Sequence, residues 1–209
     1  MSLSPLICVG SGGHAKVVIE IARAIGTYEV VGCTDPINRE PVLGVPVIGD
    51  DGQLESLWEQ GFRQAFVALG SNSLRLKLGR RLRSIGFQMP ALVHPAATIS
   101  PTARLGEGVA VMAGVVVNAE AVVGEFAILN TNCSVDHDCV VGDGAHVGPR
   151  SVLAGSVRLG EGVFLGAGAV VIPGIEVGAH TTVGAGGVVV SHLGQNVIAV
   201  GVPARVKAR

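Results

Sequence analysis

One short segment of the chain, Asp136-His137-Asp138, combines residue types that can move a proton near neutral pH. Histidine titrates in this range and can act as a general base. A carboxylate beside it can fix the tautomer of the ring and raise its basicity. A histidine in a turn more often has no chemical role, and Asp136 can equally be a plain turn residue. The triplet is therefore a candidate site for a reaction that deprotonates a nucleophile.

A second candidate segment, Gly-Ser-Gly-Gly-His at residues 10–14, follows an apolar run. The spacing Gly10-x-Gly12-x-x-Ala15 fits a glycine-rich turn between a strand and a helix, where a phosphate can approach the helix N-terminus. Asp35 falls near the end of the next expected strand, where an acidic residue can contact a ribose hydroxyl. A tight turn with no ligand is the simpler alternative. If a ligand binds, residues 1–88 leave room for a mononucleotide-sugar rather than NAD.

Strand-like and helix-like segments alternate through the first part of the chain, which predicts a small parallel α/β sheet. The expected strands are 6–10, 28–33, 46–48 and 65–70. The expected helices are 16–25, 54–60 and 74–85, the last of which is basic and amphipathic. We therefore expect a Rossmann-like domain over residues 1–88 and a second domain over residues 89–209.

The second part of the chain repeats with a period of six residues. Small or β-branched residues stand four positions after nearly every aliphatic residue of this repeat, and glycine often follows the aliphatic residue directly. One hexad makes a short strand and a turn, and three hexads close a triangular coil. The pattern predicts a solenoid with the aliphatic residues inside and with parallel strands about 4.8 Å apart. The aliphatic positions are Val93, Ile99, Leu105, Val111, Val117, Val123, Leu129, Val135, Val141, Val147, Leu153, Leu159, Leu165, Val171, Val177, Val183 and Val189.

The composition of the 209 residues narrows the choice of function. A formal net charge of −1 gives no overall field that would attract nucleic acid or an anionic membrane. The apolar run at 162–175 is short and interrupted by glycine, and Met1–Gly10 lacks the basic segment of a signal peptide. Four cysteines without a CxxC pair are typical of reduced packing residues. We therefore expect a cytoplasmic protein that binds neither nucleic acid nor membranes.

A short domain that opens with Gly-Ser-Gly-Gly-His and continues into hexads resembles the sialic acid O-acetyltransferase and bacillosamine–perosamine N-acetyltransferase family. The stretches 68–72, 92–95 and 129–131, and the closing Gly-Val-Pro-Ala-Arg at 201–205, also resemble this family, so the likeness covers nearly the whole chain. The resemblance implies that the second domain is an all-β left-handed parallel β-helix. It also implies acetyl-CoA as co-substrate, no metal, and a homotrimer with active sites between subunits.

The same resemblance implies roles for individual residues. His137 is the general base and Asp138 is its partner. The substrate-binding residues are Gly12, Gly13, His14, Asp35, Gly70 and Asn130. The acetyl-CoA-binding residues are His146, Ala167 and Ala185. Thr34 stands where some members of the family have a second acidic residue, which leaves recognition of the nucleobase open.

The implied reaction is direct transfer of an acetyl group from acetyl-CoA to the amine of a UDP- or GDP-linked 4-amino-4,6-dideoxy sugar. O-acetylation of a sialic acid is an alternative with the same base chemistry. A γ-class carbonic anhydrase-like metalloenzyme needs three clustered histidine ligands. No histidine pair in the repeat has short ligand spacing. A prism used only for assembly is a further alternative, against which the Asp-His-Asp triplet argues.

Overall fold

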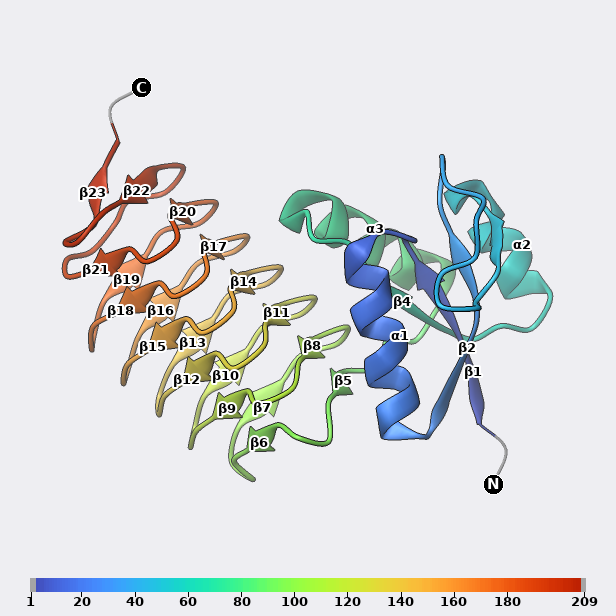
Figure 1. Ribbon diagram of the computed structural model, residues 1–209, viewed down its shortest axis with the longest axis horizontal. Coiled ribbons are helices and arrows are strands. Elements are labelled where there is room, and N and C mark those ends of the chain that lie inside the picture. The colour runs from blue at the N-terminus through green and yellow to red at the C-terminus, as the bar shows by residue number, and fades with distance from the viewer. Residues whose placement is uncertain (1–2, 208–209) are drawn as a thin grey trace. The chain divides into compact units, whose positions relative to one another are not determined.

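The computed structural model describes residues 3–207, which form two compact units that divide between Pro95 and Ala96 (Figure 1). The predicted boundary after residue 88 lies earlier, because the hexad count assigns Val93 to the repeat. None of the helices within residues 3–207 is long and apolar enough to cross a membrane.

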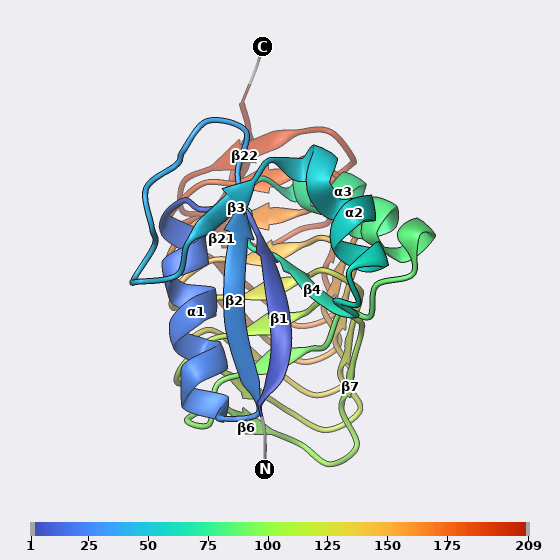
Figure 2. The same cartoon turned by 90° about the vertical axis from the view of Figure 1, so that its right-hand side faces the viewer.

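The first unit contains a four-stranded sheet in the order β3-β2-β1-β4, in which all neighbouring strands are parallel. Helix α1 lies beside β1 and β2, whereas α2 and α3 lie together toward the β4 edge (Figure 2). The strands are β1 (Ser4–Val9), β2 (Tyr28–Thr34), β3 (Val47–Gly49) and β4 (Gln64–Val67). The helices are α1 (Gly13–Ile25), the 3-10 helix η1 (Asp51–Gln53), α2 (Leu54–Glu59) and α3 (Asn72–Ile85).

Helix α1 follows from the apolar spacing of its sequence. Ala15, Val18, Ile19 and Ala22 recur at helical intervals and are all fully buried. The helix ends at Gly26, which adopts a left-handed φ of 71° and donates its N–H to the carbonyl of Ala22. Because this helix is packed along its whole apolar face, the preceding glycine turn has a fixed position at its N-terminus.

The second unit is a triangular parallel β-helix, which we call the prism, and each turn of it contributes one strand to each of three sheets (Figure 1). The long sheet of the second unit contains β8 (Ala110–Val111), β11 (Ile128–Leu129), β14 (His146–Val147), β17 (Phe164–Leu165), β20 (Thr182–Val183), β22 (Ile198–Val200) and the antiparallel β23 (Arg205–Val206). The short strand β5 (Leu92–Val93) lies at the end of the first unit. The six-strand sheet contains β6 (Thr98–Ile99), β9 (Val116–Val117), β12 (Ser134–Val135), β15 (Val152–Leu153), β18 (Val170–Val171) and β21 (Val188–Val189). The five-strand sheet contains β7 (Arg104–Leu105), β10 (Val122–Val123), β13 (Val140–Val141), β16 (Arg158–Leu159) and β19 (Glu176–Val177).

Inward aliphatic residues hold the coils together. Val117, Val135 and Leu153 pair one above the other in the six-strand sheet, and each is at most 1% exposed. Each Å² of apolar surface removed from water stabilises the folded state by about 25 cal/mol. Glycine allows the coils to approach closely: a Cβ at Gly142 would lie 2.5 Å from the carbonyl carbon of Gly160 in the next coil. The predicted solenoid is therefore present, with its core formed by the expected positions.

The first coil departs from the predicted core. Val93, Ile99 and Leu105 are only partly buried, although they belong to the same hexad series as the fully buried positions. A coil at the end of a solenoid stacks on one neighbouring coil instead of two, so its inward residues lose part of their cover.

Candidate active site

His137 lies in the turn that follows β12, on the corner between the six-strand and five-strand sheets. The buried Val135 anchors the strand before the turn. Asp138 adopts the left-handed conformation with a φ of 61°, which aspartate tolerates better than most residues. Asp136 accepts hydrogen bonds from the backbone N–H of His137 at 2.8 Å and from the Asn118 amide at 2.9 Å. Two successive coils therefore fix the backbone that carries His137.

The His137 ring is hydrogen-bonded to Asp138, with 2.8 Å between Nδ1 and Oδ2. This hydrogen bond and the nearby negative charge of Asp136 raise the pKa of His137 above its ordinary value. The carboxylate accepts a hydrogen, so in the neutral ring Nδ1 carries the proton and Nε2 keeps its lone pair. Both side chains are more than half exposed. The arrangement is a base that presents Nε2 at the surface and is supported by a carboxylate behind it.

Asn130 and His146, which the family resemblance assigns to two different ligands, are in direct contact. The Asn130 amide lies 3.0 Å from Nε2 of His146, and its carbonyl oxygen accepts from the N–H of Thr131 at 2.8 Å. Because the amide NH₂ can only donate, Nε2 of His146 is the acceptor in this contact. The ring also packs edge-on against Phe164, with 5.1 Å between centroids. Asn130 and Phe164 thus fix the orientation of the His146 ring on the outer surface of the long sheet.

Ala167 and Ala185 lie one above the other at a different corner from His137. They occupy the turns that follow β17 and β20, between the long and six-strand sheets, and Gly186 donates to the carbonyl of Ala167 at 2.8 Å. Both alanines are exposed. Within one chain, the structure therefore does not bring the His137–Asp138 pair to the same corner as these two acetyl-CoA candidates.

The glycine turn of the first unit is built as the sequence predicts. Gly10 adopts a φ of 111°, and a Cβ there would lie 2.8 Å from the Leu69 side chain. Gly12 is the N-cap residue of helix α1, and nothing lies within 4 Å of a Cβ placed on Gly12, Gly13 or Gly70. The N-terminus of α1 therefore faces open space that can admit an anionic group.

His14 stands in the first turn of α1 with a mostly buried ring. Burial, and to a lesser extent the positive charge of Arg75, lower the pKa of His14 to about 4. Its Nε2 atom is buried and has no hydrogen-bond partner in the described structure. His14 is therefore a neutral group with one unused polar atom next to the glycine turn.

Asp35 directly follows β2, and its carboxylate organises the loop around the glycine turn. One oxygen accepts from the hydroxyl and the N–H of Ser11, at 2.7 and 3.3 Å. The other accepts from the N–H groups of Ile37 and Asn38, both at 2.9 Å. Burial opposes ionisation, but these hydrogen bonds lower the pKa of Asp35 overall. In this conformation the carboxylate holds Ser11 and the 36–38 segment together, and its predicted contact with a nucleotide remains a prediction.

Arg75 is a residue of this region that sequence reasoning missed. It belongs to the helix predicted as basic and amphipathic, yet its side chain is 1% exposed. Its guanidinium donates to the carbonyls of Leu69 and Gly70 at 2.8 and 3.3 Å, and to the Asn72 side chain at 2.9 Å. Burial lowers the pKa of Arg75 to about 10. One feature of the sequence points indirectly to this role. Arg75 stands one helical turn after Ser71 and is therefore close to the loop whose carbonyls it binds.

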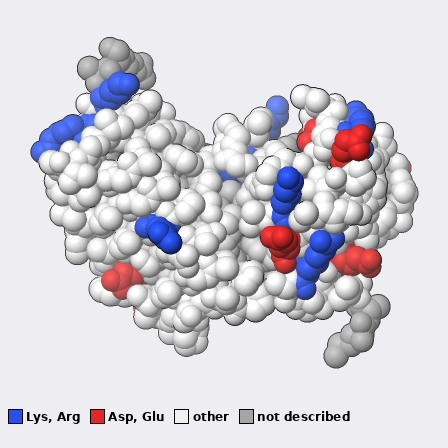
Figure 3. Space-filling model, in the orientation of Figure 1, with Lys and Arg blue, Asp and Glu red and all other residues white. Residues whose placement is uncertain are grey.

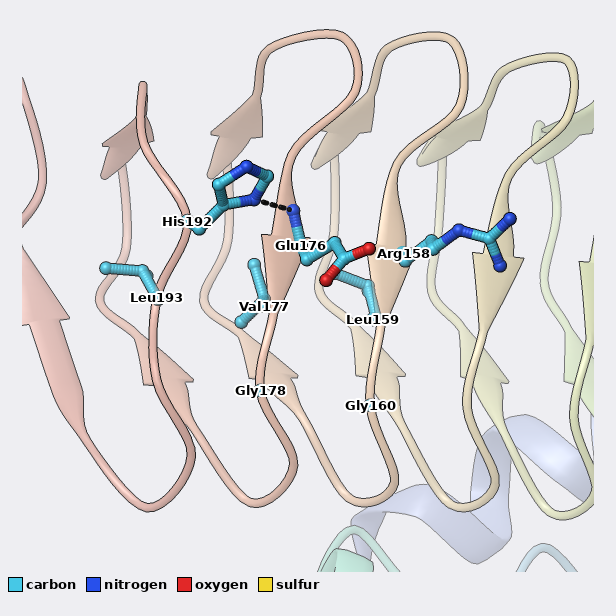
Figure 4. Close-up of a pocket in the computed structure, with 8 residues that line it drawn as sticks. All are labelled: Arg158, Leu159, Gly160, Glu176, Val177, Gly178, His192 and Leu193. Carbon is cyan, nitrogen blue, oxygen red and sulfur yellow. Dashed lines mark hydrogen bonds between the residues drawn. The ribbon is translucent and has the colours of Figure 1, made fainter.

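A surface groove of about 340 Å³ lies elsewhere, on the five-strand sheet (Figure 4). Arg158 and Glu176 face outward from its neighbouring strands, and His192 accepts from the N–H of Glu176 at 2.9 Å. None of the predicted site residues lines it. In residues 3–207, no three His, Cys, Asp or Glu side chains are grouped so that they could hold a metal ion. The groove therefore adds nothing to the candidate site.

Two family models match the chain. The N-terminal domain of PglD matches residues 5–82, and the bacterial transferase hexapeptide model, with six repeats, matches residues 156–191. The two models match the two structural units separately, and they confirm the predicted fold class of an α/β domain followed by a hexapeptide-repeat β-helix.

Solved structures match over the full length. A histidine-to-asparagine variant of perosamine N-acetyltransferase from Caulobacter crescentus, in complex with CoA and GDP-perosamine, is 53% identical with a TM-score of 0.97, and the match covers 100% of this chain and 99% of that one. The acetyltransferase domain of PglB from Neisseria gonorrhoeae, in complex with acetyl coenzyme A, is 39% identical with a TM-score of 0.93, over 99% and 100% of the two chains.

A curated relative matches over a shorter stretch. UDP-N-acetylbacillosamine N-acetyltransferase from Bacillus subtilis (strain 168) is 35% identical over 111 residues. This match spans 50% of this chain and 50% of the relative's length.

Proposed function

The chain belongs to the bacillosamine and perosamine N-acetyltransferases, and from this premise we propose that it transfers an acetyl group from acetyl-CoA to the amine of a nucleotide-linked 4-amino-4,6-dideoxy sugar. The observation that carries the proposal is the His137–Asp138 pair, because a base of raised pKa with a free Nε2 is what an amine nucleophile requires.

The proposed reaction is a direct transfer. The lone pair of the sugar amine attacks the thioester carbonyl, and the nitrogen loses a proton to Nε2 of His137. The tetrahedral intermediate then collapses, the C–S bond breaks, and the CoA thiolate takes the proton from Nε2 of His137 and leaves as a thiol. Asp138 holds Nδ1 and stabilises the positive charge that the ring gains. The products are an amide on the sugar and free CoA.

We propose a GDP-linked sugar as the substrate. The match to the perosamine enzyme, crystallised with GDP-perosamine, reaches 53% identity over the whole chain. The match to the enzyme named for UDP-N-acetylbacillosamine is 35% over half of it. The glycine turn, neutral His14 and the N-terminus of α1 are the groups that we assign to the pyrophosphate and sugar.

We further propose a homotrimer in which each active site lies between two subunits. The His137 pair and the two alanines assigned to acetyl-CoA lie on different corners of one prism, so a neighbouring copy is needed to bring such groups together. The outward positions of the six-strand sheet carry no charge and include Val116 and Val152, which are 37% and 38% exposed. Figure 3 shows one face of the molecule on which the prism carries few charged side chains. Sedimentation of the purified protein at a trimer mass supports this arrangement, and a stable monomer contradicts it.

We place the reaction in the cytoplasm, in keeping with four buried cysteines that form no disulfide bond.

The test of function is release of CoA thiol from acetyl-CoA in the presence of one acceptor at a time. The acceptors are GDP-linked and UDP-linked 4-amino-4,6-dideoxy sugars and free sialic acid. We expect fastest turnover with the GDP-linked amino sugar. Preference for the UDP-linked sugar would overturn the nucleotide assignment, and turnover on sialic acid alone would overturn N-acetylation.

A further inference from the structure

Gly155 lies one coil after His137, at the same corner of the prism. The two residues occupy equivalent places in the turns that follow β15 and β12. Gly155 is buried, and Ser156 beside it donates its N–H to the carbonyl of His137 at 2.9 Å. The backbones of the two turns are therefore joined directly, with the imidazole ring next to the glycine.

A side chain on Gly155 would occupy the place of the His137 ring. A Cβ built on Gly155 would lie 2.7 Å from Cε1 and 2.7 Å from Nε2, which is closer than real Cβ contacts. Its distance to Nδ1 would be 3.4 Å. The conflict therefore falls on the ring edge that carries Nε2, the nitrogen that Asp138 leaves free.

The backbone does not require glycine at this place. The φ angle of Gly155 is not positive, so an L-residue fits its backbone conformation. The second residue after the inward aliphatic residue carries a Cβ in every hexad from Pro95 to Ser191 except at Gly155. Ala119 and Pro173 show that the same corner accepts a Cβ in the coils before and after. The one glycine of this series thus stands beside the candidate base.

We propose that Gly155 is a positioning residue for His137, whose missing side chain is the space in which the Nε2 edge of the imidazole ring rests. This inference rests on the proposed function of His137 as the general base. The ring is the mobile end of a side chain that is more than half exposed, so a methyl group at Gly155 would move the ring rather than unfold the prism. Substitution should therefore disturb catalysis and leave the fold intact.

The test is the Gly155→Ala protein, with Gly194→Ala as the matched control. Nothing lies within 4 Å of a Cβ on Gly194, and its φ is not positive. For Gly155→Ala we expect kcat to fall about 10²-fold, the loss typical of a misplaced reacting group. We expect both KM values and the melting temperature to stay within error of wild type. The control should match wild type in all four quantities.

A double-variant cycle separates this role from the main alternative, that the glycine makes room for acetyl-CoA. If Gly155 acts through His137, then Gly155→Ala added to His137→Ala lowers the remaining activity no further. An additional loss in that background, with weaker CoA binding by calorimetry, would overturn the proposal. An unchanged kcat in the single variant would overturn it as well, and so would a large fall in melting temperature.

A second readout does not depend on enzymatic activity. The ring C–H signals of His137, assigned by comparison with His137→Ala, are followed by NMR as the pH is raised. In Gly155→Ala we expect the pKa of His137 to fall from its raised value, because a displaced ring loses its hydrogen bond to Asp138. An unchanged titration would contradict the inference. If the wild-type protein acetylates none of the acceptors, the proposed function fails, while this titration still decides whether Gly155 positions the ring.

Discussion

His137 is carried by a turn whose backbone recurs in every coil of the prism, whereas His14 and Asp35 lie in loops that occur once in the molecule. In the prism, the inward aliphatic residues specify the scaffold, and the chemical groups are added on its outer corners. In the first unit, the candidate ligand contacts are held by side-chain hydrogen bonds, such as those between Asp35 and Ser11. A corner of the prism can therefore lose its side chain without loss of fold, while the loops of the first unit depend on theirs.

The largest effect is expected for His137→Ala. Loss of a general base lowers kcat by about 10²- to 10⁴-fold. The side chain is 58% exposed and contributes little packing, so the melting temperature should stay unchanged. Steady-state thiol release and thermal unfolding measure the two quantities. A retained kcat would remove His137 from the mechanism.

Asp35→Ala tests whether a loop of the first unit depends on the hydrogen bonds of one side chain. Four hydrogen bonds to Ser11, Ile37 and Asn38 are lost, and the loop beside the glycine turn is released. A loss of about 1.4 kcal/mol of ordering free energy raises the KM for the nucleotide-sugar about tenfold. The KM for acetyl-CoA should not change, and an equal rise in both would contradict the assignment of this loop to the sugar nucleotide.

Asp138→Asn tests the pairing of His137 with Asp138 through the pH dependence of kcat/KM. Asparagine also tolerates the left-handed backbone, so the turn is kept. The pKa of His137 is raised first by its hydrogen bond to Asp138, and a general base works only when it is neutral. Wild-type kcat/KM should therefore fall as the pH drops through this raised pKa. In the variant the fall should move to lower pH, with a plateau loss smaller than that of His137→Ala. A shift to higher pH would contradict the pairing.

Asn118→Ala is expected to have the smallest effect. Its amide donates to Asp136, which in turn accepts from the N–H of His137. A net hydrogen bond contributes about 0.5–1.5 kcal/mol, so kcat should fall about two- to tenfold. Because Asn118 is exposed, the melting temperature should fall by at most a few degrees. A loss as large as that of His137→Ala would mean that Asn118 contacts the substrate itself.

The sequence predicts the prism well because each hexad meets the same packing requirement. The inward positions from Val111 to Val189 are buried as expected, and only the first coil differs. The α/β sheet was also predictable, since its apolar runs are short and separated by glycine and polar turns. Strand ends differ by one to three residues where hydrogen-bonding partners decide them, as at β4.

Contacts between side chains of separate segments were not predictable in the same way. Asn118 and Asp136 meet only because one coil stacks on the next. Arg75 is buried because three oxygens of its own loop and helix start surround it, a cluster that no periodicity reveals. The role of Gly155 depends on the side chain that lies one coil away. The residue types at such places become informative only when the register of the coils is known.

The most direct test of the central claim is identification of the bond that the enzyme forms. Wild-type protein is incubated with acetyl-CoA and a GDP-linked 4-amino-4,6-dideoxy sugar, and the product is examined by mass spectrometry and NMR while thiol release is followed. We predict one acetyl group per sugar, attached to the amino nitrogen as an amide, formed in step with CoA. An acetyl ester on a hydroxyl group, or CoA release without an acetylated sugar, would contradict it.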